Sequence, residues 1–183
     1  RPAVLMIAGM SMQLIVWPDE MVRQLHQAGF RVIRFDNRDM GLSQAMDQVP
    51  TPNLIWFMLQ QKLGLNPKPP YSVQDMAQDA LAVLDHLKIQ QAHLVGVSMG
   101  GMIAQRVALA APERVISLTS IMSSSGAQDL PDPDAEVLRL LYAPPARADL
   151  NGVVDHTLKF LQLIASPDYP QPEAVLRGTV IDE

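Results

Sequence analysis

Strand-like apolar runs alternate with segments of helical periodicity over the first two thirds of the chain. The runs that predict β-strands are residues 3–8, 31–35, 93–97 and 115–122. The segments whose apolar side chains recur every three or four positions, as in α-helices, are residues 18–28, 72–87 and 102–110. This alternation predicts an α/β fold with a predominantly parallel, doubly wound sheet and helices on both faces. The runs 3–8 and 115–122 are apolar enough to predict interior strands.

The pattern changes after residue 125, where prolines become frequent and no further strand is evident. Short amphipathic helices are predicted near residues 135–141, 153–164 and 172–180. We therefore divide the chain into an α/β core at residues 1–125 and a helical lid at residues 126–183. The lid is expected to lie over the edge of the sheet formed by the carboxyl ends of the strands. A peripheral helical extension is the alternative.

A Gly-x-Ser-x-Gly motif at Gly96, Ser98 and Gly100 joins the third predicted strand to the third predicted helix. Strand, sharp turn and helix form the context in which this motif is a nucleophile elbow. Glycines are needed there because a Cβ on either side of Ser98 would clash in so tight a turn. Ser98 itself is expected to adopt a strained backbone conformation, with the amino end of the next helix directed at the space above it.

Two other interpretations of this motif are an ordinary turn and a dinucleotide-binding fingerprint. Out of context, Gly-x-Ser-x-Gly is common and is usually an ordinary turn. A dinucleotide-binding fingerprint needs a glycine at the position of Ser98 and an acidic residue at the end of the following strand. The following strand instead runs into Ser123, Ser124 and Ser125, so both requirements fail.

Three segments of the connections that follow predicted strands are candidates for the rest of a site. Gly9 ends the first strand and begins one loop. The polar cluster 36–43 is interpreted as a loop held by Asp and Arg hydrogen bonds rather than as catalytic. Trp56 lies in the apolar patch 54–59, for which core packing is the default and a pocket wall the functional alternative. Gly9 and Trp56 are the candidate substrate-binding residues.

Composition narrows the possible functions. The 183 residues are 48% hydrophobic and 18% charged, with a net charge of −5, which argues against a nucleic-acid-binding surface or a polybasic membrane anchor. The chain has no cysteine, which excludes disulfides and thiolate nucleophiles. No apolar run is long enough to predict a membrane span, and no secretory signal is visible. We expect a cytoplasmic protein without metal or cofactor.

These motifs resemble the α/β-hydrolase fold superfamily. They are most similar to its bacterial esterases of the aclacinomycin methylesterase type, with haloperoxidase-like hydrolases as close relatives. The resemblance covers residues 1–125 and rests on the Gly-x-Ser-x-Gly motif and on an Asp-x-Arg-x-x-Gly-x-Ser loop that begins at Asp36 and ends at Ser43.

The resemblance implies carboxylic ester hydrolysis through an acyl-enzyme on Ser98. The backbone amides of Met10 and Met99 match the oxyanion-hole donors, which leaves both methionine side chains free to line an acyl pocket. The implied partner is a small-molecule ester. Two alternatives remain: a non-catalytic binding protein for a small ligand, and other chemistry on the same fold, such as perhydrolysis or C–C bond hydrolysis.

The chain departs from the family order of nucleophile, acid and histidine. His26, His86 and His93 precede Ser98, and His156 lies in a predicted lid helix, so all four are interpreted as structural. The candidate acids are interpreted as turn residues at the entry to the lid: Asp129, Asp132 and Asp134. We expect the remaining strands, with the acid and the histidine, to come from sequence outside these 183 residues or from a second chain.

Overall fold

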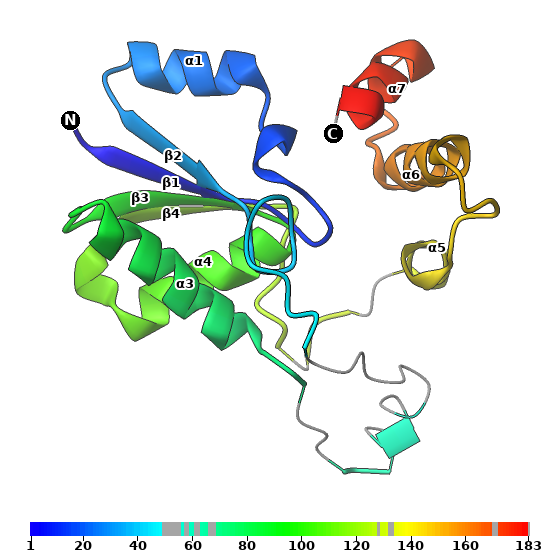
Figure 1. The fold of residues 1–183 in the computed structure, drawn as a ribbon, viewed down its shortest axis with the longest axis horizontal. Coiled ribbons are helices and arrows are strands. Elements are labelled where there is room, and N and C mark those ends of the chain that lie inside the picture. Colours follow the sequence, from blue (N-terminus) through cyan, green and yellow to red (C-terminus); the bar gives the residue numbers. More distant parts are fainter. Residues whose placement is uncertain are drawn as a thin grey trace. The chain divides into compact units, whose positions relative to one another are not determined.

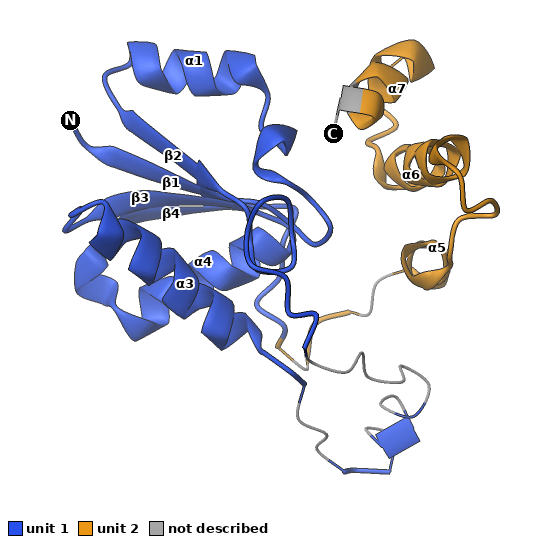
Figure 2. Cartoon of the chain, in the orientation of Figure 1, with its two compact units in different colours: residues 1–126 blue, residues 127–183 orange. Residues whose placement is uncertain are grey.

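The computed structural model divides the chain into two compact units, residues 1–126 and residues 127–183 (Figure 2). Its described residues are 1–48, 56, 59–60, 63–65, 69–127, 129–131, 134–169 and 172–182.

Unit 1 is built on a parallel sheet with the strand order β2-β1-β3-β4. The strands are β1 (Ala3–Ile7), β2 (Arg31–Phe35), β3 (Ala92–Val97) and β4 (Val115–Ile121). Strand β1 lies between β2 and β3, where Ile7 is opposite both Phe35 and Gly96. Every residue of β1 is at most 3% exposed, so the interior position predicted for residues 3–8 is confirmed.

Helices cover both faces of this sheet, as predicted (Figure 1). Helix α1 (Asp19–Gln27) lies on one face, and α3 (Val73–His86) and α4 (Met99–Ala110) lie on the other. Alternate side chains of β1 supply the two cores, because successive residues of a strand point to opposite faces. Val4 and Met6 pack with Trp17 on the α1 side, whereas Leu5 and Ile7 pack against α3 and α4. The doubly wound α/β fold is therefore confirmed.

Local sequence signals set the ends of two helices in unit 1. Ser72 caps α3: its hydroxyl accepts a hydrogen bond from the Asp75 amide, and the Asp75 carboxylate accepts one from the Ser72 amide. The Ser72 hydroxyl also donates to the Asp75 carboxylate at 2.6 Å, and this bond, together with the one from the Ser72 amide, lowers the pKa of the Asp75 carboxyl. Gly29 follows α1 with φ +92°, a left-handed conformation that glycine adopts without a steric penalty.

The interior position predicted for β4 requires strands outside these residues and stays a prediction. In the described sheet it pairs with β3 alone and forms an edge. Four of its seven residues are exposed, including Ile116 at 49%, whereas β1 is buried throughout. Polar side chains at Ser117, Thr119 and Ser120 make the run 115–122 less apolar than residues 3–8.

Unit 2 consists of α5 (Ala135–Tyr142), α6 (Leu150–Ile164) and α7 (Glu173–Asp182) in its described residues, which confirms the three predicted helices. Val154 and Leu158 of α6 are buried, and Asp155 links α6 to α7 by an ion pair of 2.7 Å with Arg177. The role of this unit as a lid over the sheet stays a prediction. Among the described helices of the whole chain, none combines the length and the apolar character needed to cross a bilayer.

Candidate active site

Ser98 lies at the turn between β3 and α4, with φ +54° and ψ −123°. Its amide donates to the carbonyl of Ile121 at 2.9 Å, and its carbonyl accepts from the Gly101 amide at 2.9 Å. These bonds fix the turn between two strands and a helix, and so hold a non-glycine residue in a conformation that costs about 1–3 kcal/mol. The strand–turn–helix context predicted for the Gly-x-Ser-x-Gly motif is present.

The glycines on either side of Ser98 let the helix approach the strands closely. A Cβ at Gly96 would lie 2.2 Å from the carbonyl oxygen of Gly100, and a Cβ at Gly100 would lie 2.0 Å from that of Ile7. Both distances are far inside van der Waals contact with backbone atoms that cannot move independently. The glycines therefore set how tightly α4 packs on β1 and β3.

Replacement of Gly100 by alanine is expected to lower the free energy of unfolding by about 3 kcal/mol or more, because the new methyl group forces the helix away from β1. Urea unfolding followed by circular dichroism measures this loss. Gly178 in α7 is the matched control, since a Cβ there meets nothing within 4 Å. Gly178→Ala is expected to leave stability unchanged or to raise it through better helix propensity. Equal losses in the two variants would contradict the packing argument.

The loop after β1 brings a second backbone segment to Ser98. A Cβ at Gly9 would lie 3.2 Å from the Cβ of Ser98, so the main chain of this loop runs directly beside the serine. Met10 follows Gly9 in the loop, and Met99 is the first residue of α4. Within the part of the chain that the structure describes, neither of these two amides donates a hydrogen bond.

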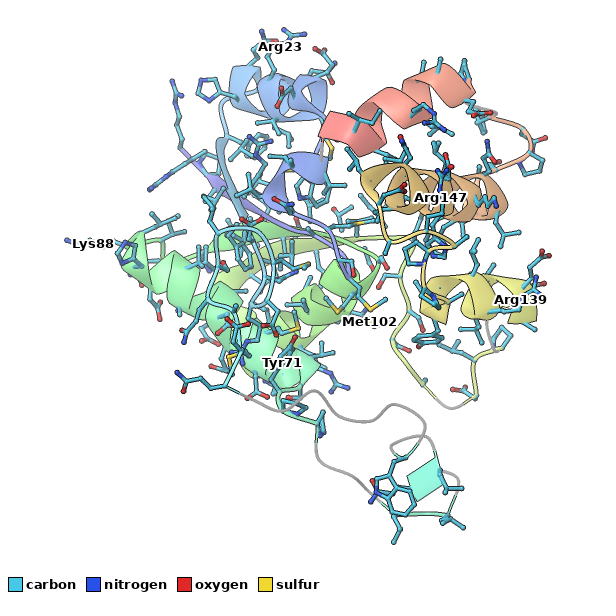
Figure 3. All side chains as sticks on the ribbon, turned by 45° about the vertical axis from the view of Figure 1, so that its right-hand side comes forward. Arg23, Tyr71, Lys88, Met102, Arg139 and Arg147 are labelled. Carbon is cyan, nitrogen blue, oxygen red and sulfur yellow. The ribbon has the colours of Figure 1, made fainter. Side chains whose placement is uncertain are left out.

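The arrangement can stabilise a developing negative charge next to Ser98. The amides of a helix's first turn have no intrahelical acceptor, and they carry the positive end of the helix dipole. Met99 supplies one such amide, and Met102 of the same helix marks this end of unit 1 in Figure 3. The Met10 side chain is 44% exposed. The Met99 side chain is partly buried and packs against the core of the sheet face that α3 and α4 cover, and the expectation that both methionines line an acyl pocket stays a prediction.

The polar loop that follows β2 is held by hydrogen bonds of its Asp and Arg side chains, as predicted for residues 36–43. Arg38 donates to both carboxylate oxygens of Asp79 in α3 at 2.7 Å, and this pairing raises the pKa of the guanidinium. The same guanidinium lies 5.2 Å from the ring centre of Tyr71. A hydrogen bond between Tyr71 and Asp39 lowers the pKa of the Asp39 carboxyl and raises that of the Tyr71 hydroxyl.

A cavity of about 450 Å³ lies between this loop and α3. Its walls include Phe35, Arg38 and Asp79, and none of the candidate site residues lines it. It is therefore separate from the turn that carries Ser98.

Three of the four histidines lie at the end of the sheet opposite Ser98. His93 is the second residue of β3, five residues before Ser98, and about 3.3 Å of rise per residue separates them by about 16 Å. It bonds to the Ser117 hydroxyl at 2.8 Å and meets the ring of Phe30 edge-on. His26 and His86 lie in the last turns of α1 and α3, which lead into the amino ends of β2 and β3.

Figure 3 shows the same separation between the two ends of unit 1. Lys88, two residues beyond α3, lies at the opposite end of the unit from Met102. The structural role assigned to His26, His86 and His93 agrees with these positions. His156 is in unit 2, where it lines a cavity of about 270 Å³ together with Arg147 and Lys159.

The remaining candidate residues are Trp56 and the acids at the entry to the predicted lid. Trp56 is 57% exposed, and its neighbours at 54–55 and 57–58 lie outside the described residues, so its role in a pocket wall stays a prediction. Asp134 caps α5 by accepting from the Glu136 amide at 2.8 Å, whereas Asp132 lies outside the described residues. No three His, Asp or Glu side chains of the described residues gather as a metal site would require.

Known proteins similar to this chain include two curated methylesterases. The chain is 37% identical over 164 residues to a rhodomycin D methylesterase of Streptomyces sp. strain C5. The aligned segment covers 90% of this chain and 48% of that protein. It is 36% identical over 174 residues to the rhodomycin D methylesterase of Streptomyces peucetius. That aligned segment covers 95% of this chain and 51% of the relative. The chain thus spans about half the length of these curated relatives.

Solved structures show the same fold at lower sequence identity. A meta-cleavage product hydrolase from Pseudomonas fluorescens superposes with a TM-score of 0.69 at 18% identity, over 99% of this chain and 56% of that one. An enol-lactonase from Burkholderia xenovorans superposes with a TM-score of 0.61 at 24% identity, over 99% of this chain and 58% of that one. The model of the family described as the alpha/beta hydrolase fold matches residues 2–174. With its parallel sheet and its serine turn, the chain belongs to the alpha/beta hydrolase fold family.

Proposed function

We propose that this chain carries the nucleophile and both oxyanion donors of a carboxylic ester hydrolase. The observation that carries the proposal is the backbone of Ser98, which is held at φ +54° on the turn between β3 and the amino end of α4. A strained serine at such a place is typical of a functional site. The similarity to two rhodomycin D methylesterases supports an ester as the substrate class.

In the proposed reaction the Ser98 hydroxyl oxygen attacks the ester carbonyl carbon and gives its proton to a base. The electron pair of the carbonyl bond moves to its oxygen, where the amides of Met10 and Met99 donate hydrogen bonds to the negative charge. Collapse of this intermediate breaks the bond to the alcohol, which leaves with a proton, and an acyl group remains on Ser98. Water then attacks the acyl-enzyme in the same way and releases the acid.

The base and its acidic partner are proposed to come from residues outside this chain, either elsewhere in the same protein or from a second chain. This proposal is supported by the positions of His26, His86 and His93 at the end of the sheet away from Ser98. The proposed partner of the site is a small-molecule ester, with Gly9 and Trp56 near it and with no metal or cofactor. Unit 2 is proposed to act as the lid. The protein is proposed to work in the cytoplasm.

A second candidate is a non-catalytic protein that uses the same turn to bind a small ligand. The observation that favours it is the same distribution of histidines, because a serine hydroxyl without a base is a weak nucleophile. Perhydrolysis and C–C bond hydrolysis are further reactions that the same turn could support.

A fluorophosphonate probe distinguishes the two candidates in the full-length protein. It phosphonylates a serine only where a base and an oxyanion hole activate the hydroxyl. The proposed hydrolase is expected to incorporate about one probe per chain, on the peptide that contains Ser98, and to hydrolyse p-nitrophenyl acetate. A protein that stays unlabelled and inactive would support ligand binding instead.

A further inference from the structure

Two buried polar side chains at the end of β2 hold the loop that carries Met10. Asp36 and Asn37 follow Phe35, the last residue of β2, and are 7% and 2% exposed. They are the buried polar or charged residues of the part of the chain that the structure describes. Since burying polar groups costs free energy unless they are hydrogen-bonded, their partners indicate what they do.

Asn37 holds the start of the loop. Its side-chain amide nitrogen donates to the carbonyl oxygen of Ala8 at 3.0 Å. Ala8 is fully buried and directly precedes Gly9, the residue whose main chain lies beside Ser98. The orientation of the Asn37 amide is fixed by chemistry, because only an N–H group can face a carbonyl oxygen at this distance.

Asp36 holds the other end of the loop. One of its carboxyl oxygens accepts a hydrogen bond from the Leu14 amide at 2.6 Å. The other accepts from the Leu42 amide at 3.1 Å, so this side chain joins the loop after β1 to the loop after β2. Gly41 leaves room for it: a Cβ there would lie 2.2 Å from the same carboxyl, and φ at Gly41 is +52°.

The chain between these two anchors is short and strained. Residues 9–13 contain Ser11 at φ +59°, a left-handed conformation that non-glycine residues adopt when their surroundings impose it. The Met10 amide lies within this segment. Its position relative to Ser98 therefore depends on where Asp36 and Asn37 hold Ala8 and Leu14.

We propose that Asp36 and Asn37 are positioning residues for the oxyanion hole, which act by fixing both ends of the loop that presents the Met10 amide to Ser98. This inference rests on the proposed function of Ser98 and Met10. Neither side chain needs to touch the substrate. Displacing a catalytic group by about 1 Å can lower a rate about 10²-fold, so loosening either anchor is expected to slow the reaction.

The test compares Asn37→Ala and Asp36→Asn in the full-length protein. Asn37→Ala removes the donor to Ala8, and Asp36→Asn keeps the shape of the side chain but sets an amide against one of two backbone N–H groups. We expect kcat for a p-nitrophenyl ester to fall about 10-fold or more in each variant, with KM changed less than about threefold. Asp36→Asn decides the question if Asn37→Ala does not fold.

Inhibition by a trifluoromethyl ketone supplies a measurement that a merely structural role would not change. The Ser98 oxygen adds to the ketone carbon, and the carbonyl oxygen becomes an oxyanion held by the same amides. The inhibition constant is expected to rise in each variant by the factor by which kcat/KM falls. The matched control is Asp79→Asn, which breaks the ion pair of Arg38 on the outer side of the same polar loop. It is expected to lower the unfolding temperature and leave kcat and inhibition within about twofold.

The outcomes separate this inference from the proposed function. A wild-type protein without esterase activity or probe labelling contradicts the proposed function before any variant is made. An active wild type whose Asp36 and Asn37 variants lose only stability, as Asp79→Asn does, overturns the positioning role alone. A parallel loss of rate and of ketone affinity in both variants supports it.

Discussion

Replacement of Ser98 by alanine is expected to lower ester hydrolysis by the full-length protein about 10³-fold or more. The residual rate comes from substrate binding and the oxyanion hole, which the substitution leaves in place. Alanine keeps the Cβ atom of serine, so the turn at φ +54° should stay equally restrained and the unfolding temperature should change little. Hydrolysis of a p-nitrophenyl ester by the purified variant measures the effect.

A second serine provides the control for this substitution. The Ser117 hydroxyl bonds to His93 at the amino end of β3, far from the turn. Ser117→Ala is expected to retain the rate within about twofold, because a surface hydroxyl with one partner contributes little to stability and nothing to the chemistry. A Ser98→Ala protein that is folded and hydrolyses the ester at nearly the wild-type rate would refute the assignment of the nucleophile.

Much of unit 1 could be predicted because its signals are local. The capping box of Ser72 and Asp75 and the glycine that ends α1 each act within a few residues of their own position. The Gly-x-Ser-x-Gly turn is also local in sequence. Its glycines nevertheless serve contacts between distant segments, since a Cβ at Gly100 would strike Ile7. The motif could be recognised without that contact because its spacing is distinctive.

The features that could not be predicted from the sequence depend on contacts between residues far apart in the chain. Asp36 and Asn37 were correctly assigned to a hydrogen-bonded loop, but their partners Leu14 and Ala8 are 22 and 29 residues away. No periodicity connects positions so far apart. The partial burial of Met99 is a similar case, because its contact with the core depends on how α4 packs on the sheet.

The interior position predicted for β4 depends on strands outside the described sheet. Residues 115–122 contain enough apolar residues to predict an interior strand, but burial depends on what covers each face. In the described sheet Ile116 is half exposed, although isoleucine is typical of buried strands. An exposed strand edge offers unpaired N–H and C=O groups to a further strand. This edge therefore agrees with the proposal that other strands complete the protein.

Replacement of Met99 by proline is expected to lower kcat about 10²-fold or more, because it deletes one of the two amides proposed to bind the oxyanion. Met99 is the first residue of α4, where the fixed φ of proline is well tolerated. A following proline, however, favours an extended conformation at the residue before it, whereas Ser98 has φ +54° and ψ −123°. The loss is therefore assigned to the amide only where the variant keeps the unfolding temperature of the wild type. Single-turnover kinetics with a p-nitrophenyl ester should place the loss in the acylation step.

Two controls separate the lost amide from other effects of this substitution. Met99→Leu keeps the amide and a side chain of similar volume for the core, and is expected to change kcat less than about threefold. Asp19→Pro introduces proline at the first position of α1, and should leave the rate unchanged. If Met99→Leu were as damaging as Met99→Pro, the side chain rather than the amide would carry the function, and the oxyanion donor would have to be sought elsewhere on the turn. Slow acylation by Met99→Pro alone would instead place the developing charge at the amino end of α4, where the helix dipole adds to the hydrogen bond.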